Sequence, residues 1–265
     1  KQNPDRLPLI VKGARQVGKT ASIRQFGESN YTNVVEINFL LQKQYCDIFD
    51  DGFETDTIIR NITLHNPELE FIPGETLIFF DELQACINCA TSLKSFKQDG
   101  RYDVICSGSL MGINYNEIES NSVGYKEDYE MYSLDFEEFL WAKGYKKEQI
   151  EELYQSMAEV RPFSSVILDV MFENFREYMV LGGMPAVVRS FVQKKNYSGT
   201  LSLQRQILLD YEEDITKYAG GLDHGKILNV YRKVPVFLGK ENKRNRQTII
   251  CVCTHIWLPD ECQRF

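Results

Sequence analysis

The sequence lacks any long apolar run, since no stretch of about eighteen consecutive apolar residues occurs in it. A basic segment followed by an apolar one, which marks a secretory signal peptide, is also missing from its start. These two absences predict a cytoplasmic protein without a transmembrane helix and without a membrane partner.

Positive charge is also scarce, because 30 Lys and Arg residues stand against 38 Asp and Glu residues, for a formal net charge of −8. This balance argues against a protein whose main activity is non-specific binding of nucleic acid. Basic clusters at 194–195 and 240–246 leave nucleic acid open as a weakly supported partner, although a solvated surface is the preferred interpretation.

Cysteine occurs seven times, and an odd number without a secretory signal favours reduced thiols. Cys86 and Cys89 have the spacing of half a zinc site or of a redox pair. The other half of a zinc site would have to come from Cys251 and Cys253, far along the chain. We therefore favour free thiols and keep the zinc site as the alternative.

Residues 13–20 have the sequence Gly-Ala-Arg-Gln-Val-Gly-Lys-Thr, which is the phosphate-binding loop pattern G-x-x-x-x-G-K-T. An apolar run at 9–11 predicts a strand before it, and 21–26 predict the start of a helix after it. We expect Lys19 to reach the β and γ phosphates of ATP and the Thr20 hydroxyl to bind Mg²⁺. The alternative is a plain glycine turn. The predicted cofactor-binding residues are Gly13, Ala14, Arg15, Gln16, Val17, Gly18, Lys19, Thr20 and Ala21.

A second apolar run, Leu77–Phe80, ends in Asp81 and Glu82 and is typical of a central parallel strand. Ligands bind at the carboxyl ends of such strands, and we expect this strand to lie next to the one that precedes the loop. Asp81 is then the predicted Mg²⁺ ligand, and Glu82 the predicted catalytic residue that activates water. The alternatives are a helix-capping acid for Asp81 and a surface acid for Glu82.

The strand expected at 104–109 ends in small polar residues, and Ser107 is a predicted catalytic contact to the γ-phosphate or to the attacking water. Small residues for a tight turn are the alternative. Further strands are expected at 34–39 and at 131–134. Because strands alternate with helical segments such as 55–65, the predicted fold is α/β with a parallel sheet.

From Asp135 onward the sequence is helical in character, beginning with a predicted cap in which Glu138 lies three residues after Asp135. Apolar residues recur at helical spacing over 163–171, 203–218 and 226–238. We therefore expect three parts. They are a P-loop ATPase core at 1–134, a helical domain at 135–243 that includes the start of an incomplete C-terminal domain, and an atypical tail at 244–265.

Several motifs together carry a family resemblance. In chain order they are Gly-Ala-Arg-Gln-Val-Gly-Lys-Thr (13–20), Leu-Ile-Phe-Phe-Asp-Glu-Leu-Gln (77–84), Ser-Gly-Ser (107–109), Tyr-Ser-Leu-Asp-Phe-Glu-Glu-Phe-Leu (132–140), Gly-Gly-Met-Pro (182–185) and Tyr-Glu-Glu-Asp-Ile (211–215). The combination resembles the prokaryotic AAA-type P-loop ATPases of the AAA+ superfamily that carry a C-terminal domain of unknown function. The resemblance implies an AAA+ fold, ATP, Mg²⁺ and a nucleotide-sensing role for Ser107.

The sequence departs from this family in two places. Family members often have a Gly-Arg pair where this chain has Gly124 and Tyr125, so an arginine finger is missing there and slow turnover is expected. A neighbouring subunit or another protein partner is then a candidate source of the cation. Residues 244–265 are rich in cysteine and do not resemble the family continuation, which fits a frameshifted or truncated end.

The sequence thus predicts an Mg²⁺-dependent ATPase whose hydrolysis moves the helical domain. The absence of an Asn-Lys-x-Asp guanine motif weakly favours ATP over GTP. A nucleotide-gated interaction module with negligible turnover is the alternative, motivated by the missing arginine. A DNA-associated ATPase is a third and weaker interpretation.

Overall fold

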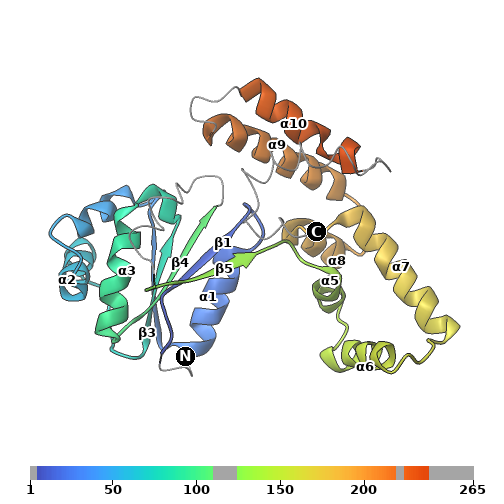
Figure 1. The fold of residues 1–265 in the computed structure, drawn as a ribbon, viewed down its shortest axis with the longest axis horizontal. Helices are drawn as coiled ribbons and strands as arrows, with labels where there is room; N and C mark the ends of the chain where they lie inside the picture. Colours follow the sequence, from blue (N-terminus) through green and yellow to red (C-terminus); the bar gives the residue numbers. More distant parts are fainter. Residues whose placement is uncertain (1–4, 110–123, 219–223, 239–265) are drawn as a thin grey trace. The chain divides into compact units, whose positions relative to one another are not determined.

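The computed structural model describes residues 5–109, 124–218 and 224–238 (Figure 1). Contacts group the chain into two compact units, one of Lys1–Ala14, Lys19–Met131 and Tyr211–Phe265 and the other of Arg15–Gly18 and Tyr132–Asp210. The predicted tail at 244–265, with Cys251 and Cys253, and the whole 240–246 basic cluster lie outside the described residues.

The elements follow one another as strands and helices first and helices alone afterwards. In chain order they are β1 (Leu9–Gly13), α1 (Lys19–Asn30), β2 (Asn33–Asn38), the 3₁₀ helix η1 (Lys43–Phe49), α2 (Thr55–His65), β3 (Thr76–Asp81), the 3₁₀ helix η2 (Leu83–Ala85), α3 (Asn88–Asp99), β4 (Asp103–Ser109), β5 (Glu127–Met131), α5 (Phe136–Ala142), α6 (Lys147–Ala158), α7 (Ser165–Leu181), α8 (Pro185–Lys194), α9 (Thr200–Tyr218) and α10 (His224–Leu238).

The five strands form one parallel sheet in the order β2-β3-β4-β1-β5. The α/β class with a parallel sheet is therefore confirmed. Two expectations about the sheet were wrong. The fifth strand is Glu127–Met131 rather than 131–134, because this edge strand is mostly polar and exposed and gives no apolar signal. The strand before the loop, β1, is not next to β3, since β4 lies between them.

Strand β3 is an interior strand of the sheet, between β2 and β4, and all six of its residues are buried. Successive side chains point to opposite faces of a strand. Accordingly, Leu77 and Phe79 join one apolar cluster while Ile78 and Phe80 join another. Helices α2 and α3 cover one face and α1 the other (Figure 1). A strand covered on both faces requires an uninterrupted apolar sequence, which β3 has.

The strand register aligns the carboxyl ends of four strands along one edge of the sheet. Asn38 of β2 pairs with Asp81 of β3. Ser109 of β4 pairs with Gly13 of β1. Because Gly13 begins the predicted phosphate-binding loop, this register brings the loop and the acidic strand end to the same edge.

The second unit, Arg15–Gly18 with Tyr132–Asp210, is called the helical unit here. Its first helix, α5, is capped by Asp135. The Asp135 carboxylate accepts a hydrogen bond from Glu138 N, and the Glu138 carboxylate accepts one from Asp135 N. This capping box was predicted from the sequence and satisfies two backbone donors at the helix start. Ser164 caps α7 in a similar way, through a hydrogen bond from Ile167 N.

The segment Gly182–Pro185 separates α7 from α8. Pro185 occupies the first turn of α8, where a missing backbone N–H costs nothing. Gly183 lies so close to the segment before α5 that a Cβ atom there would be 2.0 Å from the Leu134 carbonyl oxygen. Leu134 N also donates to Gly183 O at 2.8 Å. A glycine at 183 is thus required by the contact between these two segments.

Residues of α5, α6 and α7 line an open apolar pocket of about 530 Å³. Its lining includes Met157 and Phe172, whose side chains are 61% and 57% exposed. The helical unit therefore presents apolar side chains around α7 instead of closing them into a core. Within the described ranges, no helix combines the length and the apolar character needed to cross a membrane.

We predict that Gly183→Ala destabilises the helical unit by about 1–3 kcal/mol, because the added methyl group overlaps the Leu134 backbone and one segment must shift. Thermal unfolding followed by circular dichroism measures the effect. Ala186→Ser, at an exposed position of the neighbouring helix α8, is the control and should leave the midpoint unchanged. An unchanged midpoint for Gly183→Ala would contradict the close approach.

Candidate functional site

The loop between β1 and α1 has the backbone conformation that a phosphate cradle needs. Gln16 and Gly18 have φ angles of 64° and 104°, and residues with positive φ turn successive N–H groups toward a common centre. The Lys19 ammonium donates to Gly13 O at 2.9 Å and to Ala14 O at 2.7 Å, so it lies over the start of the loop. Of the other predicted loop residues, Val17 is buried, Arg15 is half-buried and Ala21 is exposed.

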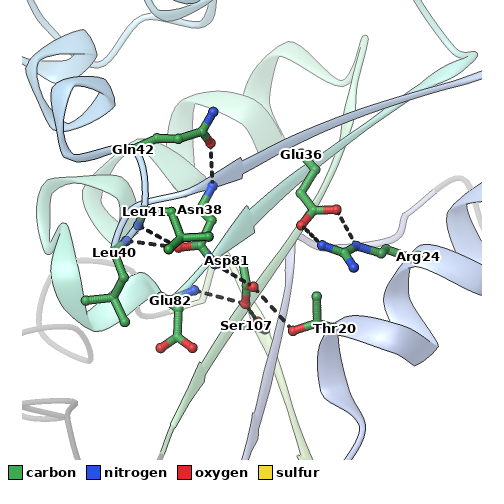
Figure 2. Close-up of polar contacts among 10 residues, drawn as sticks. All are labelled: Thr20, Arg24, Glu36, Asn38, Leu40, Leu41, Gln42, Asp81, Glu82 and Ser107. Atoms are coloured by element: carbon green, nitrogen blue, oxygen red, sulfur yellow. Dashed lines mark hydrogen bonds and ion pairs between the residues drawn. The ribbon is translucent and has the colours of Figure 1, made fainter.

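The Asp81 carboxylate lies at the centre of the site and is only 4% exposed. It accepts hydrogen bonds from Thr20 Oγ1 at 3.3 Å, Asn38 Nδ2 at 3.0 Å, Glu82 N at 3.0 Å and Ser107 Oγ (Figure 2). These donors come from α1, β2, the residue that follows β3, and β4, so the Asp81 carboxylate at the end of β3 connects α1, β2 and β4. All four donors are neutral, and the negative charge of Asp81 is therefore solvated but not cancelled by them.

Asn38 is a site residue that the sequence interpretation missed. Its amide nitrogen donates to Asp81 while its Oδ1 accepts hydrogen bonds from Leu40 N and Leu41 N at 3.1 and 3.0 Å. The side chain therefore ends β2, fixes the following turn and holds Asp81 from the side (Figure 2). The available signal was a polar residue near the end of the strand predicted at 34–39. Its hydrogen-bond partner could not be predicted, because it depends on β2 lying next to β3.

Glu82 follows Asp81 in the left-handed conformation, with φ 59° and ψ 50°. A residue other than glycine adopts this conformation at a cost, and such residues gather at functional sites. The turn sends the Glu82 side chain away from the Asp81 carboxylate (Figure 2). The Glu82 carboxylate accepts a hydrogen bond from the amide of Gln84.

Ser107 and Ser109 are both buried at the end of β4. The Ser107 hydroxyl donates to Asp81, and Ser109 Oγ accepts a longer hydrogen bond of 3.4 Å from Gln84 Nε2. The structure thus brings the predicted residues Thr20, Asp81 and Ser107 into direct contact. It places Glu82 beside them with a different partner.

Gln16 has a partner outside the loop. The amide of Gln16, a residue that groups with the helical unit, donates to the Asp210 carboxylate at 2.7 Å.

Beside the site, the Arg24 guanidinium forms a bidentate pair with Glu36, whose hydrogen bonds raise the pKa of Arg24 (Figure 2). This pair joins α1 to β2 next to Thr20 and Asn38.

Cys86 and Cys89 lie in the apolar core beneath the site, where Cys106 also packs. All three are free thiols. Burial raises the pKa of the Cys86 thiol to about 12, so it is protonated at neutral pH. In the described part of the chain, no three or more His, Cys, Asp or Glu side chains converge to hold a metal ion.

The donor set of the site fits Mg²⁺ bound together with a phosphate group. Mg²⁺ prefers oxygen ligands, and it is usually held by one or two protein side chains plus substrate phosphates and water. Thr20 Oγ1 and Asp81 Oδ2, 3.3 Å apart, offer a hydroxyl and a carboxylate of this kind. The glycine loop and the amino end of α1 supply the backbone N–H groups that favour a phosphate.

A parallel sheet whose first strand runs through a glycine loop into a helix, with an acidic strand end beside it, defines the P-loop nucleoside triphosphatase fold of the AAA+ type. The chain belongs to the AAA domain family, whose model matches residues 5–140. A second model, the domain of unknown function DUF8612, matches residues 172–249. The family resemblance predicted from the motifs is therefore confirmed.

Three solved structures resemble the chain at low sequence identity. AMPPCP-bound DnaA from Aquifex aeolicus has 15% identity and a TM-score of 0.37, over 97% of this chain and 76% of that one. A crystal structure of a DNA replication initiation factor has 15% identity and a TM-score of 0.35, over 95% and 74%. C. elegans PCH-2 has 11% identity and a TM-score of 0.33 over 56% of this chain, which spans 40% of that protein. The sequence matches no curated protein.

We predict that Asn38→Asp destabilises the protein by about 1–3 kcal/mol at neutral pH, because it puts a second carboxylate against Asp81. Aspartate keeps an oxygen that can accept from the backbone N–H groups of residues 40 and 41. Because it also removes the Nδ2 donor to Asp81, the pH dependence of the deficit is what identifies charge repulsion. Repulsion raises the pKa of one carboxyl of the pair above its unfolded value, so the folded variant binds more protons than the unfolded chain. The deficit relative to wild type should therefore shrink as the pH falls toward about 5.

Urea denaturation at several pH values measures this deficit. Asn33→Asp, on the same strand, is the matched control: Asn33 also donates one amide hydrogen bond, to the Glu70 carbonyl. A deficit for Asn38→Asp that does not change between neutral and acidic pH would contradict the predicted repulsion.

Proposed function

We propose that this protein binds ATP together with Mg²⁺ and hydrolyses it. The observation that carries the proposal is the 3.3 Å approach of the Thr20 hydroxyl to the Asp81 carboxylate at the end of a glycine loop. A metal ion that is held by these two groups would lie beside phosphates that are held by the loop. Bound Mg²⁺ would neutralise charge on the phosphates as the terminal one is transferred.

Each residue of the site has a distinct proposed role. The backbone of 13–18 would accept the phosphates and the Lys19 ammonium would contact the β and γ oxygens. Thr20 and Asp81 would hold the metal, directly or through water. Asn38 and Ser107 would keep the Asp81 carboxylate oriented, because both donate to it.

Glu82 is the proposed general base for hydrolysis. It follows the metal-binding acid directly, and its carboxylate is turned away from Asp81, so it is available to accept a proton from an attacking water.

Ser107 would respond to the γ-phosphate through its hydrogen bond to Asp81. We further propose that ATP turnover drives movement of the helical unit.

A nucleotide-gated interaction module with negligible turnover is a second candidate, favoured by one observation. The resembled family often has an arginine after the glycine at 124, where this chain has Tyr125. The ring of Tyr125 lies 5.2 Å from the Lys94 ammonium. In such a module bound ATP, rather than its hydrolysis, would be the signal.

We predict that Glu82→Gln lowers the rate of phosphate release by about 10²–10⁴-fold and leaves ATP affinity nearly unchanged, because an amide accepts no proton from water. A steady-state phosphate-release assay and titration with a fluorescent ATP analogue measure the two quantities. Glu68→Gln, at an exposed acid, is the matched control. Lys19→Ala should abolish binding itself. ATP binding without any Glu82-dependent release would remove the hydrolase and favour the gated module.

We predict that Asp81→Asn removes most of the gain in ATP affinity that Mg²⁺ provides, about 10–100-fold, because one charged ligand is lost. Affinity in the presence of EDTA should hardly change, since the loop and Lys19 remain. Titrations with Mg²⁺ and with EDTA give this comparison directly. Asp47→Asn, at an exposed aspartate of η1, is the control. An equal loss of affinity in both buffers would show that Asp81 does not act through the metal.

A further inference from the structure

Gln84 connects the carboxylate of Glu82 to the end of strand β4. Its Nε2 donates to Glu82 Oε2 and also reaches Ser109 Oγ at 3.4 Å. Ser109 is 3% exposed and pairs in register with Gly13, where the loop begins. A hydrogen-bonded chain from Glu82 through Gln84 to Ser109 therefore spans from the end of β3 to the strand beside the loop.

The turn that carries Gln84 is firmly held. Leu83 is completely buried in the apolar core. Ala85 N donates to Glu82 O at 2.8 Å, and Cys86 N donates to Leu83 O at 3.0 Å. Together with the left-handed conformation of Glu82, these contacts hold the backbone from which the Gln84 side chain extends. A glutamate side chain has several rotatable bonds, and a hydrogen bond from a donor on a fixed turn restricts the positions of its carboxylate.

The orientation of the Gln84 amide is set by Glu82. With the amide as placed, Nε2 faces the carboxylate, whereas a flipped amide would put Oε1 against a carboxylate oxygen. Oε1 is buried, and no donor among the described residues reaches it. The side chain thus keeps one acceptor unpaired while its donor holds Glu82, and burying an unpaired acceptor is unfavourable. Unfavourable local features such as this unpaired acceptor occur more often at functional sites than elsewhere in a protein.

We propose that Gln84 is a positioning residue for ATP hydrolysis, which holds the Glu82 carboxylate in the orientation from which it accepts the proton of the attacking water. The inference rests on the proposed function, because it gives Glu82 the role of base. Ser109 steadies the same amide from β4. Gln84 itself touches neither the phosphates nor the metal in this account, so it should affect catalysis and not binding.

The test compares two variants with wild type in the full chain. Gln84→Met keeps the length of the side chain and removes its hydrogen bonds, and Gln84→Glu replaces the donor by an acceptor that repels Glu82. Both should lower kcat for phosphate release by about 10–100-fold, because a misplaced base costs about that much. The KM for ATP and the affinity for a fluorescent ATP analogue should stay within about twofold, since ground-state binding does not use Glu82.

Glu82→Gln supplies the background that separates positioning from general stability. If Gln84 acts through Glu82, adding Gln84→Met to Glu82→Gln should lower kcat no further, because the group that Gln84 orients is already lost. Gln204→Met is the matched control. The Gln204 amide also makes two donations, to the carbonyls of Val180 and Leu181 in the helical unit, and its loss should leave kcat unchanged.

Four results decide the matter. Loss of kcat at constant KM, absent on the Glu82→Gln background, supports the inference. Wild-type kcat in Gln84→Met or in Gln84→Glu, with Glu82→Gln inactive, overturns it and leaves the proposed function standing. The same fold-loss in both backgrounds also overturns it, because Gln84 then acts independently of Glu82. Absence of Glu82-dependent hydrolysis in wild type overturns the proposed function, and this inference with it.

Discussion

The buried carboxylate of Asp81 is the constraint on which the rest of the site depends. A charge at 4% exposure is tolerable only where hydrogen bonds replace water, and Asp81 has four such bonds. The donors Thr20, Asn38 and Ser107 come from three different elements. The requirement to satisfy one anion therefore fixes the positions of α1, β2 and β4 against β3. Because these donors are neutral, none of them cancels the negative charge of the carboxylate.

Much of this framework could be predicted because it is encoded locally. The apolar run of β3 has one explanation, a strand buried on both faces, and the two acids that end it must then lie at a sheet edge. The loop at 13–20 specifies its own backbone through glycine and the helix that follows. The capping box at Asp135 needs only residues three apart, and it formed as expected. In each case the interacting groups are neighbours in sequence.

The contacts that escaped prediction are those that depend on strand order. Asn38 is near Asp81 only because β2 and β3 are paired in that register, and the sequence carries no mark of it. Strand β5 was placed four residues too late because its polar, exposed residues give no periodic apolar signal. The role of Gln84 required the left-handed turn at Glu82, which no residue type announces, since glutamate rarely adopts it.

Because β4 lies between β1 and β3, its end is next to both the glycine loop and the acidic end of β3. Side chains two apart on a strand share a face, so Ser107 and Ser109 point to the same side of the sheet. Ser107 donates to Asp81, and Ser109 reaches Glu82 through Gln84. The end of β4 thus contacts Asp81 directly and is connected to Glu82 through Gln84, and the other neighbour of β4 is the strand that begins the loop. Direct contact between β1 and β3, as the sequence suggested, would have left each acid to be held separately.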